Sequence, residues 1–440
     1  MPVSSSRLAG SRPNILMVIV HDLGQHLGCY GAGLQTPNLD AMAAEGVVFT
    51  NYCCTAASCS PSRGSMVTGR YPHRNGLIGL AHLGWQLGGQ EVTLPMYLNA
   101  AGYQTHLIGI QHEHPEARRL GYQYTDTGAG DARTCAQRIA RFLEDRAAAA
   151  TSEPFYLSSG WSEPHRPYYA DGYQRDDPAT VTPLPWLPDR PGIREDIAAL
   201  NGLVYRVDEC MGRVREALAR TGLAESTLLI FTTDHGLAMP RAKGTCYDPG
   251  LKTAFLAHWP GHVEGGRTQS ELLTNCDLCP TLLELAGMEA PDTLDGRSFL
   301  PLWSGDPYEP RDSIFAEMTW HDQYNPMRAI RTVRHKYIRN FGERPLVFIP
   351  LDIWRECRDE QVKRDFYATR RPAEELYDLV EDPLEQRNLI DDPRCAAVAA
   401  EVRQRVDDWM RETNDFLLYG DAPVSQALLD RWERESWDNG

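Results

Sequence analysis

The sequence predicts an α/β fold, in which a large, mostly parallel central sheet is flanked by helices and followed by a smaller C-terminal α+β unit. Ile15 to Val20 is an uninterrupted apolar run, which is typical of a parallel strand buried on both faces, and Leu228 to Phe231 is a second run of this kind. Between them, apolar residues recur at spacings of three and four from Ile197 to Leu218, as in an amphipathic helix. Strands that alternate with helices indicate a sheet whose ligands bind at the carboxyl ends of the strands.

Four shorter patterns extend this sheet and its covering helices. Thr105 to Ile110 and Phe155 to Leu157 are rich in the apolar and β-branched residues that strands favour. Asp40 to Ala44 and Leu94 to Ala101 space their apolar side chains as helices do.

The pattern of apolar and polar residues changes near residue 312, where the C-terminal part begins. An alternating pattern of paired strands, a short strand and a long helix are expected, in this order, at Met327 to Asn340, Glu375 to Leu379 and Ala396 to Thr413. Because single cores stop growing near roughly 250 to 300 residues, two domains are expected for a chain of 440 residues. We predict a catalytic domain at residues 1–312 and a smaller domain at residues 313–440.

Composition narrows the possible classes of function and location. The formal net charge of −16 disfavours binding to nucleic acid or to an anionic membrane, since both need an electropositive face. Neither a signal-peptide core in the first eleven residues nor an apolar stretch of roughly 18 residues is found. The eleven cysteines are an odd number scattered along the chain, which indicates free thiols. A soluble, cytoplasmic protein is the expectation.

The segment from Cys59 to Arg70 is a candidate anion site. Ser60 followed by Pro61 reads as an N-cap and a first-turn proline, which would place Cys59 just ahead of a helix N-terminus. Backbone amides and the helix dipole favour an anion there, and Arg63 could grip a sulfate or phosphate with two hydrogen bonds. The alternative, a buried structural cysteine in a loop-to-helix turn, stays open at this point.

Polar pairs follow both of the long apolar runs. His21-Asp22 comes directly after the first run, and Asp234-His235 follows the second. Because the carboxyl ends of parallel strands share one edge of a sheet, the two pairs should meet there, although solvated strand ends would give the same pattern.

The string that begins at Cys59 resembles the signature of the sulfatase family. In that family the motif Cys-x-Pro-x-Arg, met here by Cys59, Pro61 and Arg63, is recognised by a separate enzyme that oxidises the cysteine to formylglycine. Similar family strings stand at Arg12 to Ile15, Thr36 to Asp40, Asp234 to Gly236 and Glu375 to Asp378. Within the family the chain most resembles the sulfamidases, the N-sulfoglucosamine sulfohydrolases, at Tyr71 to Leu80, Pro326 to Arg328 and Glu381 to Leu389.

The resemblance implies one divalent cation beside the nucleophile, held by Asp22, Asp234 and His235, with His21 as a further candidate ligand. Many sulfatases carry two aspartates in place of His21-Asp22, and often Asp-Asn in place of Asp234-His235. Nitrogen ligands shift the preference from calcium towards softer metals such as manganese, iron or zinc. Both calcium and a softer metal therefore stay open.

Three further residues match family positions that bind the sulfate or handle protons: His112, His165 and Lys243. His165 is the expected acid for the leaving group, although a loop histidine taken alone is more often a solvated surface residue. Ile110 stands where the family has a lysine. We expect that His114 or another nearby group substitutes for this lysine, that turnover is weakened, or that the substrate differs from the usual one.

The resemblance implies hydrolysis of a sulfate ester or a sulfamate, with N-sulfoglucosamine as one candidate substrate. One hydroxyl of the hydrated formylglycine attacks sulfur, and the second hydroxyl then expels sulfate as the aldehyde re-forms. The expected partners are a small sulfated substrate such as a sugar and the formylglycine-generating enzyme. The alternatives are a phosphonate or phosphate ester hydrolase of the same alkaline phosphatase superfamily, which the Asp234-His235 pair would suit, and an inactive relative that binds a sulfated sugar.

Overall fold

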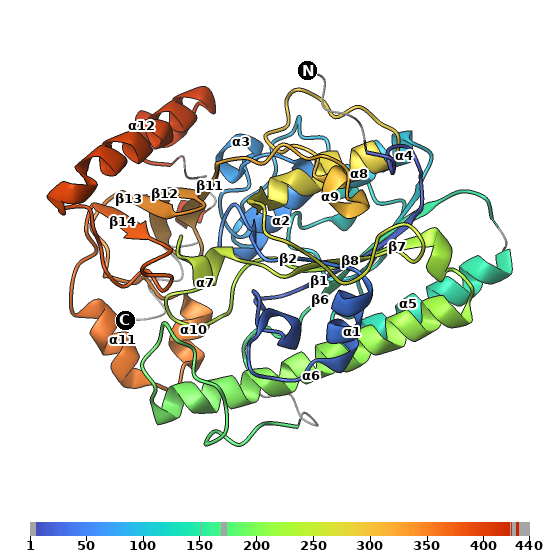
Figure 1. The fold of residues 1–440 in the computed structure, drawn as a ribbon, viewed down its shortest axis with the longest axis horizontal. Coiled ribbons are helices and arrows are strands. Elements are labelled where there is room, and N and C mark those ends of the chain that lie inside the picture. Colours follow the sequence, from blue (N-terminus) through green and yellow to red (C-terminus); the bar gives the residue numbers. More distant parts are fainter. Residues whose placement is uncertain (1–5, 150, 169–173, 423, 425–427, 431–440) are drawn as a thin grey trace.

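The computed structural model of the protein describes residues 6–149, 151–168, 174–422, 424 and 428–430 (Figure 1). Its main sheet has eight strands in the order β5-β4-β6-β1-β7-β8-β2-β9. The five strands from β5 to β7 are parallel, β8 is antiparallel to both of its neighbours, and β2 is parallel to β9. The predicted mostly parallel sheet is therefore confirmed. In chain order these strands are Asn14–Val20 (β1), Val47–Phe49 (β2), Gln104–Gly109 (β4), Tyr124–Asp126 (β5), Phe155–Trp161 (β6), Thr227–Thr233 (β7), Phe255–His258 (β8) and Arg267–Gln269 (β9).

Helices cover both faces of this sheet. In Figure 1, α1, α5 and α6 lie below the sheet, and α2, α4, α8 and α9 lie above it. Successive residues of β1 point to opposite faces, so Leu16 and Val18 pack in the core with α5 and α6, and Ile15 and Met17 pack with α4 and α8. The helices are Pro37–Glu45 (α1), Cys59–Thr68 (α2), Pro72–Asn75 (α3), Leu94–Ala100 (α4), Ala132–Ala149 (α5), Pro191–Arg220 (α6), Asp248–Leu251 (α7), Leu278–Leu285 (α8) and Leu300–Ser304 (α9).

The C-terminal part is built on a second sheet of four antiparallel strands in the order β11-β12-β13-β14. Helix α12 packs against it through Val406 and Trp409, which share a core cluster with Ile330 and Tyr337 of the sheet. The smaller α+β unit is therefore confirmed. Its elements are Ser313–Trp320 (β11), Tyr324–Thr332 (β12), His335–Asn340 (β13), Leu351–Glu356 (α10), Glu360–Tyr367 (α11), Glu374–Asp378 (β14) and Ala396–Glu412 (α12). A further two-stranded sheet pairs Tyr52–Cys53 (β3) with Leu273–Thr274 (β10).

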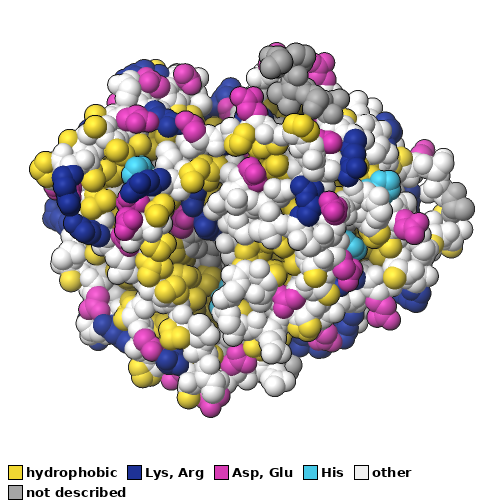
Figure 2. All heavy atoms as spheres, viewed as in Figure 1, with side chains coloured by type: hydrophobic (Ala, Val, Ile, Leu, Met, Phe, Trp, Pro, Cys, Tyr) yellow, Lys and Arg dark blue, Asp and Glu magenta, His cyan; other side chains and the backbone are white. Residues whose placement is uncertain are grey.

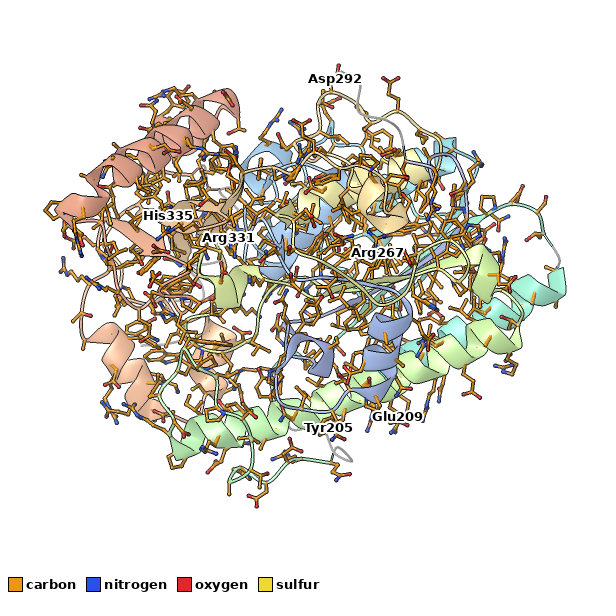
Figure 3. All side chains as sticks on the ribbon, viewed as in Figure 1. Tyr205, Glu209, Arg267, Asp292, Arg331 and His335 are labelled. Carbon is orange, nitrogen blue, oxygen red and sulfur yellow. The ribbon has the colours of Figure 1, made fainter. Side chains whose placement is uncertain are left out.

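The two sheets are joined by a shared core and by buried charges. Ile314 of β11 lies in the same apolar cluster as the α5 and α6 side of the main sheet. Asp248 of α7 pairs with Lys336 of β13 and with Arg331 of β12, which is labelled in Figure 3; the Arg331 Nε to Asp248 Oδ1 distance is 3.0 Å. Lys336 Nζ also lies 2.8 Å from Glu385 Oε1. Because the two parts share their interior, a division at residue 312 stays a prediction.

The cysteines, the helix lengths and the surface charges can be compared with what the composition predicted. All eleven cysteines are free thiols, as predicted. Among the described residues, no helix combines the length and the apolar character that a membrane crossing needs. Figure 2 shows acidic and basic side chains interspersed over the face in view.

Candidate active site

The predicted polar pairs meet at the carboxyl ends of β1 and β7. Val20 and Thr233 are partners in neighbouring strands, so the residues that follow them emerge side by side. Asp22 adopts a φ of 50°, and its backbone N–H donates to Asp234 Oδ1 at 3.0 Å. His21, Asp22, Asp234 and His235 are all buried.

Helix α2 brings Cys59 to this cluster with its N-terminus. The Cys59 sulfur lies 3.3 Å from His235 Nε2 and 3.8 Å from Asp22 Oδ1. The helix is fixed there because Ser62 Oγ donates to the Asp234 carbonyl and Asn275 Nδ2 donates to the Ser62 carbonyl at 2.9 Å.

The predicted cap of this helix is wrong by two residues. Ser58, with extended backbone, is the N-cap, and the helix starts at Cys59 itself. Ser60 Oγ instead accepts a hydrogen bond from the Ala81 N–H at 3.0 Å, a tertiary contact that local sequence does not show. Cys59 is therefore the first residue of the helix, where the backbone N–H groups have no partners within the helix and can face an anion.

The surroundings of Cys59 favour negative charge. Burial would raise the pKa of its thiol, but the positive charges of Lys243 and His235 hold that pKa well below its usual value. Arg63 is buried one turn further along α2, with Nε 3.0 Å from Asp234 Oδ2. Its Nη2 has no hydrogen-bond partner, so this donor is free for an anion.

Three of the four predicted ligands, His21, Asp22 and Asp234, lie close enough together to hold a divalent cation. One potential ligand atom each from His21, Asp22, Cys59 and Asp234 lie within 4.8 Å of one another. The His21 ring is buried, its Nδ1 lies 3.2 Å from Asp234 Oδ2, and its Nε2 has no hydrogen-bond partner, which suits a metal ligand. His235 Nδ1 bonds to the Gly236 carbonyl at 2.9 Å, and its Nε2 faces Asp22 Oδ1 at 3.0 Å. Burial would lower the pKa of His235, but Asp234 and Asp22 raise it well above its usual value, so a metal would have to displace the Nε2 proton.

Lys243 and His165 lie on the other side of Asp22. The Lys243 ammonium lies between two carboxylates, 2.8 Å from Asp22 Oδ2 and 2.7 Å from Asp352 Oδ2. Burial would lower the pKa of Lys243, but these carboxylates raise it well above its usual value. His165 Nε2 lies 3.4 Å from Lys243 Nζ and 3.6 Å from Asp22 Oδ2. The His165 side chain is 32% exposed, so it stands at the opening of the cluster.

His112 completes the set that the sequence predicted. Its ring packs against His21 with centroids 4.6 Å apart, and it interacts with the Cys59 thiol. Burial lowers the pKa of His112 to about 4, so the ring is neutral near pH 7. All nine predicted site residues thus come together from distant parts of the chain.

Two residues of the cluster were missed. Asp352 comes from α10, and His321 follows β11 and interacts with the Cys59 thiol. Burial alone would lower the pKa of His321, but Asp322 and Cys59 raise it to about 9. The pair His321-Asp322 ends a strand as His21-Asp22 does, and this repetition was a usable signal. No comparable sequence pattern points to Asp352.

Ile110 stands at the position where a lysine was expected from the resemblance, and its side chain lies against Gly130 and Gly160. His114 turns to its own loop, where Nδ1 accepts the Glu116 N–H at 2.9 Å. Positive charge beside Cys59 comes instead from Lys243, His235 and His321.

Comparisons with known proteins agree with this geometry. A model of the sulfatase family matches residues 13–288, and a model of the C-terminal region of N-sulphoglucosamine sulphohydrolase matches residues 236–348. An ulvan-active sulfatase of Formosa agariphila is 30% identical over 94% of this chain and 83% of its own length. Human N-sulphoglucosamine sulphohydrolase is 28% identical over 93% of this chain and 92% of its own length.

A solved structure with the same fold is a protein in complex with its substrate D-glucosamine-2-N,6-O-disulfate. It aligns with a TM-score of 0.70 at 20% identity and covers 92% of this chain and 98% of its own. Since the family model spans more than half of the chain, the protein belongs to the sulfatase family, whose enzymes hydrolyse sulfate esters or sulfamates.

Proposed function

We propose that the protein hydrolyses a sulfate ester or sulfamate with a formylglycine formed from Cys59. The observation that carries this proposal is the position of Cys59 at the N-terminus of α2, 3.3 Å from His235 Nε2 and beside the candidate metal ligands. Cys59, Pro61 and Arg63 also meet the motif that the formylglycine-generating enzyme recognises, so this enzyme is the proposed maturation partner.

The residues around Cys59 bind and orient the sulfate group. Arg63 offers its free Nη2, and Lys243 and His321 place further positive charge near the sulfur of Cys59. Hydrated formylglycine supplies the hydroxyl nucleophile. A divalent cation, when bound by His21, Asp22, Asp234 and His235, neutralises charge on a sulfate oxygen.

His165 is the proposed acid for the leaving group. Its Nδ1 bonds to the Arg166 carbonyl, which orients the ring so that Nε2 faces Lys243 and Asp22. Nε2 is therefore the atom that delivers the proton. An amine leaves poorly without a proton, so a sulfamate substrate depends on this group more than an aryl sulfate does.

The proposed substrate is N-sulfoglucosamine or a short oligosaccharide that ends in it. Support comes from the matching C-terminal model, from the human relative and from the sugar bound by the solved neighbour. A net charge of −16 disfavours a long polyanion, since like charges repel it at low salt.

The test is sulfate release from N-sulfoglucosamine, O-sulfated sugars and 4-nitrophenyl sulfate, alongside hydrolysis of an aryl phosphonate. Each substrate is given to one preparation matured with the formylglycine-generating enzyme, with Cys59→Ala as the control. A preference for N-sulfoglucosamine supports the proposal. A preference for O-sulfates would assign another sulfatase specificity, one for phosphonates would favour a phosphonate hydrolase, and no turnover would favour a binding protein. A cytoplasmic location stays a prediction.

A further inference from the structure

The Cys59 thiol is a potential metal ligand in the chain as it is translated. Among the described residues, three clusters bring three or more potential ligand atoms within 4.8 Å of one another, and all three lie in the candidate active site. The thiol belongs to two of these clusters, one with His21 and His112 and the other with His21, Asp22 and Asp234. Cys59 and His21 are therefore the ligands that both clusters share.

The larger of these two clusters has the dimensions of a zinc site. His21 Nδ1 lies 3.2 Å from Asp234 Oδ2 and 3.7 Å from Asp22 Oδ1. The Cys59 sulfur lies 3.8 Å from the same Asp22 oxygen. Around a tetrahedral zinc ion such atoms are roughly 3.3–3.6 Å apart, because Zn–N and Zn–O bonds measure about 2.0–2.2 Å and Zn–S bonds about 2.3 Å. The measured distances fall within a few tenths of an ångström of this range, and all four side chains are buried.

Charged groups outside the cluster hold its carboxylates in place. Lys243 Nζ lies 2.8 Å from Asp22 Oδ2, so the other oxygen of Asp22 faces the thiol. Arg63 Nε lies 3.0 Å from Asp234 Oδ2, an oxygen that has a second lone pair for a metal. Outer partners of this kind fix the orientation of metal ligands. The same lysine lies between Asp22 and Asp352, so its ammonium group already occupies the third cluster.

The sulfur decides which metal this cluster favours. Calcium and magnesium take oxygen ligands, whereas thiolate and imidazole ligands favour zinc. Conversion of Cys59 to formylglycine replaces the sulfur by oxygen and so removes the softest ligand of the cluster. The metal preference should therefore differ between the unconverted chain and the converted one.

We propose that the chain in which residue 59 is still a cysteine binds one zinc ion in a closed, four-coordinate site formed by His21, Asp22, Cys59 and Asp234. The zinc–sulfur bond forms as the thiol proton is released to water. With four protein ligands the zinc ion keeps no open position for a sulfate oxygen, so unconverted chains are held in an inactive, zinc-bound form. The inference goes beyond the proposed function, because it concerns the chain before Cys59 is converted.

The test uses the full chain produced without the formylglycine-generating enzyme and freed of metal with a chelator. Cobalt(II), which can occupy zinc sites, should give the intense near-ultraviolet absorption of a cobalt–thiolate bond, and one equivalent of zinc should abolish it. Fully converted protein should lack this absorption.

The zinc affinity is measured by competition with a chelating dye. Cys59→Ala should lower this affinity at least about a hundredfold, because loss of even an outer partner of a metal ligand costs about 10- to 100-fold. Cys279→Ala removes another buried free thiol, which lies in the apolar cluster around α8. It is the matched control and should leave both the absorption and the zinc affinity as they are.

The outcomes separate this inference from the proposed function. If the unconverted chain shows no cobalt–thiolate absorption, or if Cys59→Ala binds zinc as tightly as the unsubstituted chain, the zinc site is refuted and the proposed function is untouched. If the absorption appears and the converted protein releases no sulfate, the zinc site stands and the proposed function fails. The absorption is measured on the unsubstituted chain, so it decides the question even where Cys59→Ala does not fold.

Discussion

Replacing Asp234 by asparagine removes one buried negative charge from the centre of the cluster and little else. Oδ1 accepts the N–H groups of Asp22 and His235, at 3.0 and 2.9 Å, and an amide oxygen can still accept both. Oδ2 pairs with Arg63 Nε at 3.0 Å and lies 3.2 Å from His21 Nδ1, and an amide NH₂ cannot accept either contact. Leaving Arg63 buried and unpaired should cost about 3–5 kcal/mol.

The same substitution should abolish metal binding, because it removes one of two carboxylate ligands. The wild-type protein should hold one divalent cation per chain, which at a hundredfold excess over Kd stabilises the fold by about 2.7 kcal/mol. Elemental analysis and urea unfolding with and without a chelator measure both effects. Asp234→Asn should lose the metal, the activity and the response to the chelator.

Asp208→Asn is the matched control for this experiment. Asp208 is also a buried aspartate, but it accepts the N–H groups of Asn38 and Leu39 at the start of α1, away from the cluster. The Asp208→Asn variant should therefore keep its metal. The reasoning is refuted if Asp234→Asn retains a full equivalent of metal and full activity.

Three more substitutions test separate parts of the account. His165→Gln should lower kcat for a sulfamate by about 10²- to 10⁴-fold but spare 4-nitrophenyl sulfate, whose leaving group needs no proton; equal losses would contradict its role as an acid. Lys336→Met should lower the free energy of unfolding by about 3–5 kcal/mol, because it breaks a buried ion pair with Asp248. Lys252 is partly exposed and lies 3.8 Å from the same carboxylate, so Lys252→Met should cost at most about 1 kcal/mol. Similar losses for the two variants would show that the buried network does not join the sheets. Burial lowers the pKa of His106 to about 4 in the folded protein. The pKa of a histidine in an unfolded chain is roughly 6.5. The contribution of His106 to stability is therefore present above about pH 6.5 and is lost as the pH falls through the folded-state pKa. His106→Phe should therefore flatten the loss of urea stability on acidification, and parallel curves would mean that His106 does not titrate in this range.

The strands that carry the site were predictable because they are buried on both faces. The apolar run at Ile15 to Val20 matches β1, and Leu228 to Phe231 lies within β7. Strand β6 was predicted only as far as Leu157, because Ser158, Ser159 and Gly160 carry no apolar signal although they are paired with β1. Local patterns thus reveal a strand where side chains are apolar, and miss it where backbone pairing alone defines it.

The site was predictable where its residues follow strands or belong to a motif. His21-Asp22 and Asp234-His235 met as expected, because parallel strands end at one edge. The cap at Ser60 was wrong and Asp352 was missed for one physical reason: both positions are determined by contacts with residues far away in sequence, Ala81 in the first case and Lys243 in the second.

The measurement that tests the central claim most directly follows residue 59 and sulfate release in the same samples. Protein produced with increasing amounts of the formylglycine-generating enzyme is digested, the peptide that contains residue 59 is analysed by mass spectrometry, and sulfate release is assayed on each sample. We predict an aldehyde at residue 59 and an activity proportional to the fraction converted, with none in Cys59→Ala. Complete conversion without sulfate release, or sulfate release from Cys59→Ala, would contradict the account.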